Sequence, residues 1–292
     1  MSEHHINSYR VGQRFSQAMT TYDKHAVLQR EVAQRLITHI EFTRLKPKRI
    51  LDIGCGTGYF TGLLRGRFKR AHIVALDLAG TMTEAAKKQH VRSFPWQAKT
   101  QFATADALAL PFPDAGFDLV CSNLTMQWVT EPERMLAEMR RVLAPGGLML
   151  LSTFGRRTLS ELRQSLASIK HEYAGLVLPF PDVTNLGNCL MELPVELPVT
   201  DADLFTLTYP DAMALVRELK AWGASASAIS NRPGGLYGRG LLRQLDAAYN
   251  TTHQMEDGRV RATFEVLYAQ AWYAEAPHTY DNVIPIQVEH GS

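Results

Sequence analysis

The chain has 292 residues, of which 46% are hydrophobic and 21% are charged, an ordinary composition for a folded globular protein. This composition excludes a largely disordered chain. The longest uncharged apolar stretches, such as residues 148–154, are well short of the roughly 20 residues that a bilayer-crossing helix needs. With no charged and apolar leader at the start of the sequence, we expect a cytoplasmic protein that binds no membrane.

The distribution of charge bears on the kind of partner, and the spacing of the cysteines bears on whether a metal site is present. The net charge is +2, but residues 1–100 carry a balance of +10 and residues 101–292 a balance of −8. This asymmetry either steers an acidic partner to the N-terminal half or reflects solvated helix faces. The cysteines Cys55, Cys121 and Cys189 are too far apart for a CxxC metal site, so we expect free buried thiols and no metal centre.

Residues 1–46 are predicted to form helices. One apolar stripe recurs every fourth residue and indicates an amphipathic helix: Leu28, Val32, Leu36 and Ile40. An earlier stripe predicts a preceding helix: Phe15, Met19 and Tyr22. Pro47 ends this segment.

Residues 47–154 alternate short apolar runs with helical patterns, which is typical of an α/β fold with a parallel sheet. The predicted strands are 49–53, 72–78, 101–105, 117–123 and 148–154, and the predicted helices are 58–68, 81–92 and 131–143. The run Pro145-Gly146-Gly147 is expected to separate the last helix from the fifth strand.

The pattern changes after residue 155. We expect a helix over 159–173, a proline-marked turn at 178–181, extended chain over 195–209, a helix over 211–222, a glycine-rich loop at 230–240 followed by a helix to residue 249, and a strand over 263–273. Residues 155–183 and 210–257 are interpreted as insertions that form a lid over a single domain spanning 1–292. The tail after residue 277 matches no pattern.

The first predicted strand runs into a glycine loop, Asp52-Ile53-Gly54-Cys55-Gly56-Thr57-Gly58. Glycines there let the chain turn sharply and let a ligand approach the backbone. Tyr59 stands where a dinucleotide-binding GxGxxG would have its third glycine, so the loop does not match that fingerprint.

Two aspartates follow the next predicted strands. Asp77 ends the second strand, where a carboxylate can accept both hydroxyls of a ribose, and Asp106 follows the third, where it can accept from an adenine amino group. Helix capping or a turn is the alternative role for each. The carboxyl ends of parallel strands meet at one edge of the sheet, which is where ligands bind in such folds.

The combination of motifs resembles the class I S-adenosylmethionine-dependent methyltransferases. The resemblance rests on the glycine loop, Asp77, Asp106, the strand Phe117-Asp118-Leu119-Val120 and Leu143-x-Pro145-Gly146-Gly147. It implies a Rossmann-like α/β fold whose mostly parallel seven-stranded sheet has helices on both faces, with S-adenosylmethionine as cofactor. The cofactor-binding residues that it implies are Asp52, Gly54, Cys55, Gly56, Gly58, Asp77, Leu78, Asp106, Ala107 and Asn123.

A narrower resemblance spans about residues 14–275. It is carried by Arg14-Phe15-x7-Tyr22-x2-His25-x2-Leu28-Gln29, Ser122-Asn123-Leu124-x-Met126-Gln127-Trp128, Ser152-Thr153-Phe154-Gly155, Leu219-Lys220-x2-Gly223-Ala224 and Asn231-Arg232-x2-Gly235-Leu236. These motifs are similar to those of the malonyl-[acyl-carrier protein] O-methyltransferases of biotin synthesis. The resemblance implies methylation of the free malonyl carboxylate on acyl carrier protein, with S-adenosylhomocysteine as product. Malonyl-coenzyme A stays open as an alternative substrate.

Substrate-positioning residues are expected in these motifs. A carboxylate is already ionised at pH 7, so no catalytic base is required. Arg232 is the first candidate to hold the carboxylate, followed by Arg156 and Arg157, because a guanidinium matches a carboxylate with two donors. Tyr22, Gln127 and Trp128 are the other candidates, with packing as the alternative role for Tyr22 and Trp128. A structural role is favoured for His25.

Other interpretations remain open at this stage. A class I methyltransferase with another small acceptor, a protein similar to mitochondrial complex I assembly factors, and a scaffold that binds the cofactor without turnover all fit the core motifs. Nucleic acid is disfavoured as a partner, because no Asn-Pro-Pro-Tyr motif is present and aromatics do not interleave with the basic residues. On charge alone, the residues proposed to attract an acidic carrier protein are Arg10, Arg14, Arg30, Arg35, Arg65, Arg67, Lys69 and Arg70.

Overall fold

The structure is a computed structural model that describes residues 12, 13, 16, 25–41, 43–90, 98–222 and 239–274. Three predicted features lie outside these residues: the helix around Phe15, Met19 and Tyr22, the loop that contains Arg232, and the tail after residue 277. In the described part of the chain, no helix has the length and apolar character needed to span a membrane.

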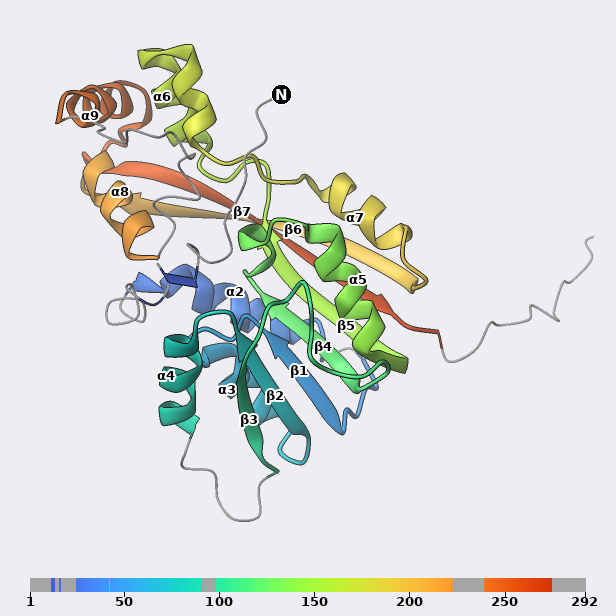
Figure 1. Ribbon diagram of the computed structural model, residues 1–292. Coiled ribbons are helices and arrows are strands. Elements are labelled where there is room, and N and C mark those ends of the chain that lie inside the picture. Colours follow the sequence, from blue (N-terminus) through green and yellow to red (C-terminus); the bar gives the residue numbers. More distant parts are fainter. Residues whose placement is uncertain are drawn as a thin grey trace, which may run out of the picture.

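A seven-stranded sheet forms the centre of the molecule, in the order β3-β2-β1-β4-β5-β7-β6 (Figure 1). The strands are β1 Arg49–Ile53, β2 His72–Asp77, β3 Thr100–Thr104, β4 Phe117–Asn123, β5 Leu143–Phe154, β6 Glu196–Tyr209 and β7 Val260–Trp272. The first five pair in parallel, whereas β7 pairs antiparallel with both β5 and β6. The predicted mostly parallel sheet of seven strands is confirmed.

Helices cover both faces of this sheet (Figure 1). They are α2 Val27–Thr38, α3 Tyr59–Arg67, α4 Gly80–His90, α5 Pro132–Val142, α6 Ser160–Ile169, α7 Val183–Met191, α8 Ala212–Ala221 and α9 Arg239–His253, with short 3-10 helices η1 Met126–Trp128 and η2 His171–Leu176. Residues of α2, α3, α6, α8 and α9 contribute to one core, and residues of α5 and α7 contribute to the other.

Successive side chains of the central strands point to opposite faces of the sheet, so the same strands contribute to both cores. In β4, Leu119 and Cys121 face the core under α2 and α3, whereas Val120 faces the core under α5. All three are fully buried. Burying a side chain such as Leu119 stabilises the fold by about 1.5–3 kcal/mol, so the two-residue period of the strand builds both layers at once.

The structure departs from the predicted elements in three places. Strand β5 begins at Leu143 instead of residue 148, because Gly146 and Gly147 exchange backbone hydrogen bonds with Tyr273. Helix α6 ends at Ile169, after which the chain turns into η2. Helix α7 was not predicted, although Asp182 caps it and Asn185 completes a capping box.

The helices of the predicted lid gather at one edge of the sheet. Helix α6 follows β5, α8 follows β6 and α9 precedes β7, so all three leave from the edge at which the parallel strands end (Figure 1). The indole N–H of Trp222, directly after α8, donates to the carbonyl of His25, two residues before α2, at 2.7 Å. This bond joins the end of α8 to the segment that precedes α2.

Candidate cofactor site and active site

A pocket opens at the carboxyl ends of β1, β2, β3 and β4. Its walls come from residues at and after the ends of these strands, from the start of α4 and from Gly12 in the N-terminal segment: Gly12, Ile53, Gly54, Gly56, Leu76, Asp77, Leu78, Met82, Ala105, Asp106, Ala107, Asn123, Leu124, Thr125, Trp128 and Val129. Ligands bind at this edge in open α/β sheets. Seven of the ten residues expected to bind the cofactor lie in this wall: Gly54, Gly56, Asp77, Leu78, Asp106, Ala107 and Asn123.

The glycine loop is shaped by close approach to neighbouring backbone and side chains. The amides of Gly54 and Cys55 both donate to the carbonyl of Leu76, at 2.8 and 2.9 Å, which fastens the loop to the end of β2. Gly54 has φ +73°, and a Cβ there would lie 1.9 Å from Oγ1 of Thr125. Only glycine fits this position, because the backbone is left-handed and Thr125 fills the space.

Asp77 connects the glycine loop to α4. One carboxylate oxygen accepts the amide of Gly56 at 3.0 Å, and the other accepts the amide of Ala79 at 2.8 Å. Burial raises the pKa of this carboxyl, while the backbone amides oppose that shift. Each oxygen still has a lone pair for a further donor, so Asp77 both orders the loop and offers acceptors to the pocket.

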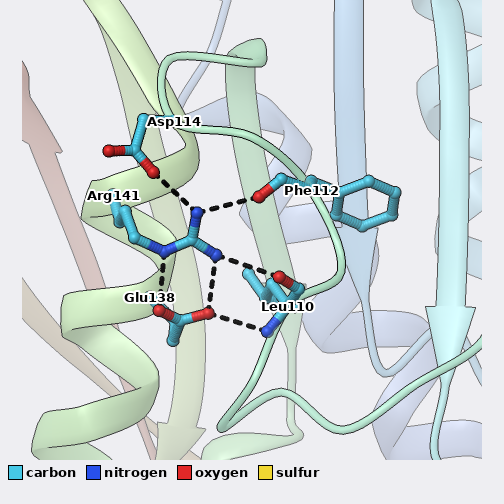
Figure 2. Close-up of polar contacts among 5 residues, drawn as sticks. All are labelled: Leu110, Phe112, Asp114, Glu138 and Arg141. Atoms are coloured by element: carbon cyan, nitrogen blue, oxygen red, sulfur yellow. Dashed lines mark hydrogen bonds and ion pairs between the residues drawn. The ribbon is translucent and has the colours of Figure 1, made fainter.

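Asp106 lies on a loop that α5 clamps from outside (Figure 2). The guanidinium of Arg141 donates to the carbonyls of Leu110 and Phe112, at 2.9 and 2.8 Å, and to the carboxylate of Asp114 at 2.8 Å. Arg141 also binds both oxygens of Glu138, at 2.7 and 2.8 Å, and lowers the pKa of that carboxyl. The loop from Asp106 to Asp114 is therefore held at several points by one helix.

Asp52 lies beneath the glycine loop and outside the pocket wall. It is 1% exposed, and one of its oxygens accepts the hydroxyl of Thr61 at 2.5 Å. Its other oxygen, Oδ1, has no hydrogen-bond partner within the part of the chain that the structure describes. Burial raises the pKa of Asp52 to about 7, with a smaller contribution from the nearby charge of Asp77.

A smaller hollow adjoins the pocket on the side of α2. Gly54, Gly56 and Asn123 line both spaces, and Gln29 and Arg30 close the hollow from the helix. The amide of Asn123 donates to the carbonyl of Gln29 at 3.2 Å, and its oxygen accepts from the hydroxyl of Ser152 at 2.9 Å. Asn123 therefore ties α2 to the ends of β4 and β5, which positions Gln29 and Arg30 beside the glycine loop.

Comparison with known proteins identifies the family. Residues 51–151 match the family model described as "Methyltransferase domain". A malonyl-[acyl-carrier protein] O-methyltransferase from Halorhodospira halophila is 42% identical, covering 90% of this chain and 86% of the relative, and one from Laribacter hongkongensis is 40% identical, covering 90% and 88%. This chain belongs to the malonyl-[acyl-carrier protein] O-methyltransferase family. It is therefore an S-adenosylmethionine-dependent O-methyltransferase.

Solved structures with similar folds agree with this assignment at the level of fold. The YcgJ protein from Bacillus subtilis superposes with a TM-score of 0.58 over 83% of this chain and 99% of its own, at 14% identity. A putative methyltransferase from Bacillus halodurans gives a TM-score of 0.57 over 83% and 98%, at 17% identity. This chain thus shares its α/β fold with these two proteins.

Three of the ten residues expected to bind the cofactor do not line the pocket at the strand ends. Asp52 supports the loop from below, as described above. Cys55 lines the smaller hollow instead, and Gly58, with φ +94°, caps α3, where its carbonyl is 2.9 Å from Nε2 of His90. Asp52 and Gly58 hold the shape of the loop, a role that motif spacing does not separate from ligand contact, whereas Cys55 lines the hollow together with Gly54 and Gly56.

Gln127 and Trp128, the substrate-positioning candidates that follow β4, line different spaces. Trp128 lines the main pocket, whereas Gln127 lines a second cavity on the other side of η1. The Gln127 amide donates to the carbonyl of Leu124 at 2.9 Å, and its oxygen accepts the hydroxyl of Thr153 at 3.2 Å. Gln127 is thus oriented by the protein itself.

Other candidate residues do not reach the pocket in the described structure. Arg156 is 74% exposed and 4.0 Å from Asp182, and Arg157 is also exposed. Nδ1 of His25 lies 3.9 Å from Glu218, next to the link with α8, which agrees with the structural role favoured for it. Tyr22 and Arg232 fall among the residues that the structure leaves undescribed.

Two of the arginines proposed to attract a carrier protein have partners within the chain. Arg65 is 9% exposed, and its guanidinium donates to the carbonyls of Ala71 and Lys99 and to the hydroxyl of Thr100. Arg35 is paired with Glu31 and with Asp203 of β6, at 3.1 and 2.8 Å. The charge count did not reveal this, because it separates neither a buried cation such as Arg65 nor an ion-paired exposed one such as Arg35 from free surface charge.

The site also contains residues whose contact with the pocket the sequence did not predict. Thr125 and Val129 line the main pocket, and Gln29 and Arg30 line the hollow beside it. Gln29 ends one of the motifs that carry the family resemblance, and Arg30 follows it, so the sequence marked this segment without assigning it to the site. Their nearness to the glycine loop depends on the path of α2 across β4 and had no local signal.

Proposed function

We propose that this chain transfers a methyl group from S-adenosylmethionine to the free carboxylate of malonyl-[acyl-carrier protein], forming the methyl ester that begins pimeloyl chain synthesis for biotin. The observation that carries the proposal is similarity at 40–42% identity, over 90% of this chain, to proteins named for that reaction. The pocket at the carboxyl edge of the sheet supports it, because polar groups of the predicted types converge there.

The pocket residues fit S-adenosylmethionine, which when bound supplies a methyl group on a positively charged sulfur. Asp77 offers acceptors for two ribose hydroxyls, and Asp106 offers one for an adenine amino group. Leu78 is 37% exposed in the pocket wall and presents apolar surface to a flat ring. Gly54 and Gly56 let the ligand approach the backbone.

Gln29 and Arg30 suit the amino-acid end of this cofactor. Oε1 of Gln29 is buried and has no hydrogen-bond partner among the described residues, so it can accept from an ammonium group. Arg30 supplies a guanidinium, the best match for a carboxylate. The oxygen of Gln29 and the guanidinium of Arg30 thus complement the ammonium and the carboxylate of the amino-acid end of S-adenosylmethionine. We assign that end of the cofactor to this hollow.

The chemistry requires positioning and no proton transfer. The malonyl carboxylate is ionised at neutral pH and attacks directly, so the residues of the site have to align its oxygen behind the methyl group and exclude water. The product is a neutral methyl ester in place of the negatively charged malonyl carboxylate. An uncharged chain end enters apolar enzyme pockets at much lower cost than a carboxylate, which is the physical use of the reaction.

The lid remains part of the proposal. We propose that residues 155–183 and 210–257 cover the substrate, with Arg232 and Tyr22 reaching the acyl group. The position of α6, α8 and α9 at the carboxyl edge of the sheet supports this, as does the bond between Trp222 and His25.

The test is methyl transfer from labelled S-adenosylmethionine to malonyl-loaded acyl carrier protein, with acetyl-loaded and succinyl-loaded carriers as controls. A base-labile ester that forms only with the malonyl carrier supports the proposal. The same assay with malonyl-coenzyme A decides whether the carrier protein is required. Cofactor binding without transfer to any malonyl thioester would refute the proposal.

A further inference from the structure

A second cavity lies beside the cofactor pocket. Its volume is about 280 Å³, close to the lower end of small-molecule sites at about 300–1,000 Å³. It is enclosed by η1, the start of α5, the turn at 178–181 and α7, and Figure 1 shows α5 and α7 side by side. Its lining residues among those described are Met126, Gln127, Val129, Thr130, Pro132, Glu133, Leu136, Thr153, Leu178, Pro179, Phe180, Pro181, Asn185, Leu186 and Cys189.

This cavity adjoins the cofactor pocket along a single short element. Val129, directly after η1, lines both spaces, and the two residues before it divide between them: Trp128 lines the cofactor pocket and Gln127 lines the cavity. A flexible chain lying in the cavity therefore needs to pass only one residue to bring its end to the cofactor pocket.

The lining of the cavity selects for a neutral ligand with amide groups. The floor is apolar and buried, with Met126 at 4%, Leu136 at 1% and Leu186 at 1% exposure. The amide of Gln127 is held in one orientation by Leu124 and Thr153, which leaves a donor and a lone pair for a ligand. Glu133 contributes a carboxylate, which repels an anion such as the malonyl end.

The cavity opens to solvent between two elements that form its rim. Pro179, on the turn, and Asn185, on α7, are exposed, whereas Leu178 and Leu186 beside them are buried. A large carrier can thus remain outside while a thin chain enters between the turn and the helix.

We propose that this cavity receives the pantetheine arm of the malonyl thioester, an inference that rests on the proposed function. The arm is neutral, carries two amides and a dimethyl group, and is long enough to separate a carrier protein from its acyl end. The acidic Glu133 directs the malonyl carboxylate away from the cavity and around Val129 toward the cofactor pocket. The arm thereby enters with one orientation.

A substitution that fills the cavity tests the inference. Cys189→Trp places a large ring in the lining, and Met191→Trp is the matched control, because Met191 lies on the same helix but is 72% exposed and outside the lining. Cys189→Trp is expected to raise KM for malonyl-acyl-carrier protein and malonyl-coenzyme A by about tenfold or more, with a smaller loss for malonyl-N-acetylcysteamine, which lacks most of the arm. Affinity for S-adenosylhomocysteine and the melting temperature serve as checks on folding.

Labelling of Cys189 gives a second readout that needs no turnover. The other two cysteines, Cys55 and Cys121, are 6% and 0% exposed, so N-ethylmaleimide is expected to react first at Cys189. Acetyl-coenzyme A, whose sulfur is acylated and does not consume the maleimide, should slow this reaction by about fivefold, whereas S-adenosylhomocysteine alone should not.

The outcomes separate this inference from the proposed function. Equal losses for long and short thioesters in Cys189→Trp, or no loss for any of them, would overturn the inference while leaving the methyltransferase activity in place. Absence of protection by acetyl-coenzyme A would overturn it as well. If the unaltered chain methylates no malonyl thioester, the proposed function fails, yet protection of Cys189 would still support an arm-binding cavity.

Discussion

Thr125 explains why the glycine loop tolerates no side chain at Gly54. The threonine Oγ1 lies 1.9 Å from the position of a Cβ there, and the residue sits at φ +73°. A methyl group would therefore have to displace Thr125 or the end of β1. Because both residues line the pocket, either movement also changes the surface that receives the cofactor.

Gly54→Ala is expected to destabilise the fold by about 3 kcal/mol and to weaken cofactor binding, because the clash adds to about 1–2 kcal/mol of left-handed backbone strain. Adding Thr125→Gly removes the clash but not the strain. Chemical denaturation of the two single variants and the double variant measures the coupling, which should favour the double variant by at least about 1 kcal/mol. Strictly additive losses would show that the contact with Thr125 is not the cause.

Arg30→Gln tests the assignment of the amino-acid end of the cofactor. Loss of a charge-assisted hydrogen bond should weaken S-adenosylhomocysteine by about 10–100-fold, while methylthioadenosine, which has no amino-acid end, should bind within about twofold of its original affinity. Isothermal titration of both ligands measures the difference. The matched control is Arg35→Gln on the same helix, where Arg35 pairs with Glu31 and Asp203 away from the pocket. Equal losses for both ligands would contradict the assignment.

Among elements, α5 acts on the cofactor pocket although none of its residues lines that pocket. Arg141 reaches from this helix to three groups of the loop that follows Asp106, and Glu138 accepts the backbone amide of Leu110 at 2.7 Å (Figure 2). The charged pair thus satisfies buried backbone groups of a loop that has no regular structure of its own.

Arg141→Leu is expected to lower stability by about 2 kcal/mol and to weaken cofactor affinity, because loop carbonyls lose their donors and Asp106 loses its fixed position. Thermal melting and cofactor titration measure the two effects. Arg134→Leu on the same helix removes only an exposed pair with Glu131, at 3.6 Å, and should change stability by less than about 0.5 kcal/mol. An unchanged cofactor affinity in Arg141→Leu would rule out a positioning role.

The elements that sequence predicts well are those with a strong local pattern. Strands β1 and β4 were predicted because their apolar runs are short and lie between turn residues, and α2 because one stripe recurs every fourth residue. Helix α7 was missed, although Asp182, Asn185, Leu186 and Leu190 form a capping box and an apolar pair. The preceding prolines suggested a loop and hid these signals.

The candidate site was predictable to the extent that it lies at strand ends. Asp77 and Asp106 follow β2 and β3, so their convergence follows from parallel strands alone. The contacts of Arg141 and Arg65 were not predictable, since both arginines bind backbone carbonyls of distant turns. The arm-binding cavity likewise depends on how α7 packs against α5, which no local pattern encodes.

For the molecule as a whole, Asp52 couples stability to pH. Its pKa is about 7 when folded, because the carboxyl is buried, and about 4 when the chain is unfolded. Between these values the folded state keeps a proton that the unfolded state releases, so the free energy of unfolding falls as pH rises from about 4 to 7. Above pH 7 this contribution is lost and the dependence levels off.

Asp52→Asn should flatten this dependence, removing up to about 4 kcal/mol of variation across the window, at about 1.4 kcal/mol per pH unit. Chemical denaturation in steps of about one pH unit, from about pH 4 to pH 7, gives the slope of the unfolding free energy against pH. Asp201→Asn is the control, because Asp201 is exposed and accepts only the amide of the next residue, Ala202. A slope that Asp52→Asn leaves unchanged would assign the effect to another group, with Asp77 the first candidate.

The strand order has a consequence for synthesis on the ribosome. Strand β6 lies at the edge of the sheet and pairs only with β7, which follows it in the chain and inserts between β5 and β6. Chains emerge N-terminal part first, so β1 to β5 can assemble early, while β6 waits without a partner until β7 has left the exit tunnel. The nascent chain therefore completes the parallel strands and the glycine loop before the antiparallel edge of the sheet forms, and a ribosome stalled before β7 leaves β6 without the strand that joins it to β5.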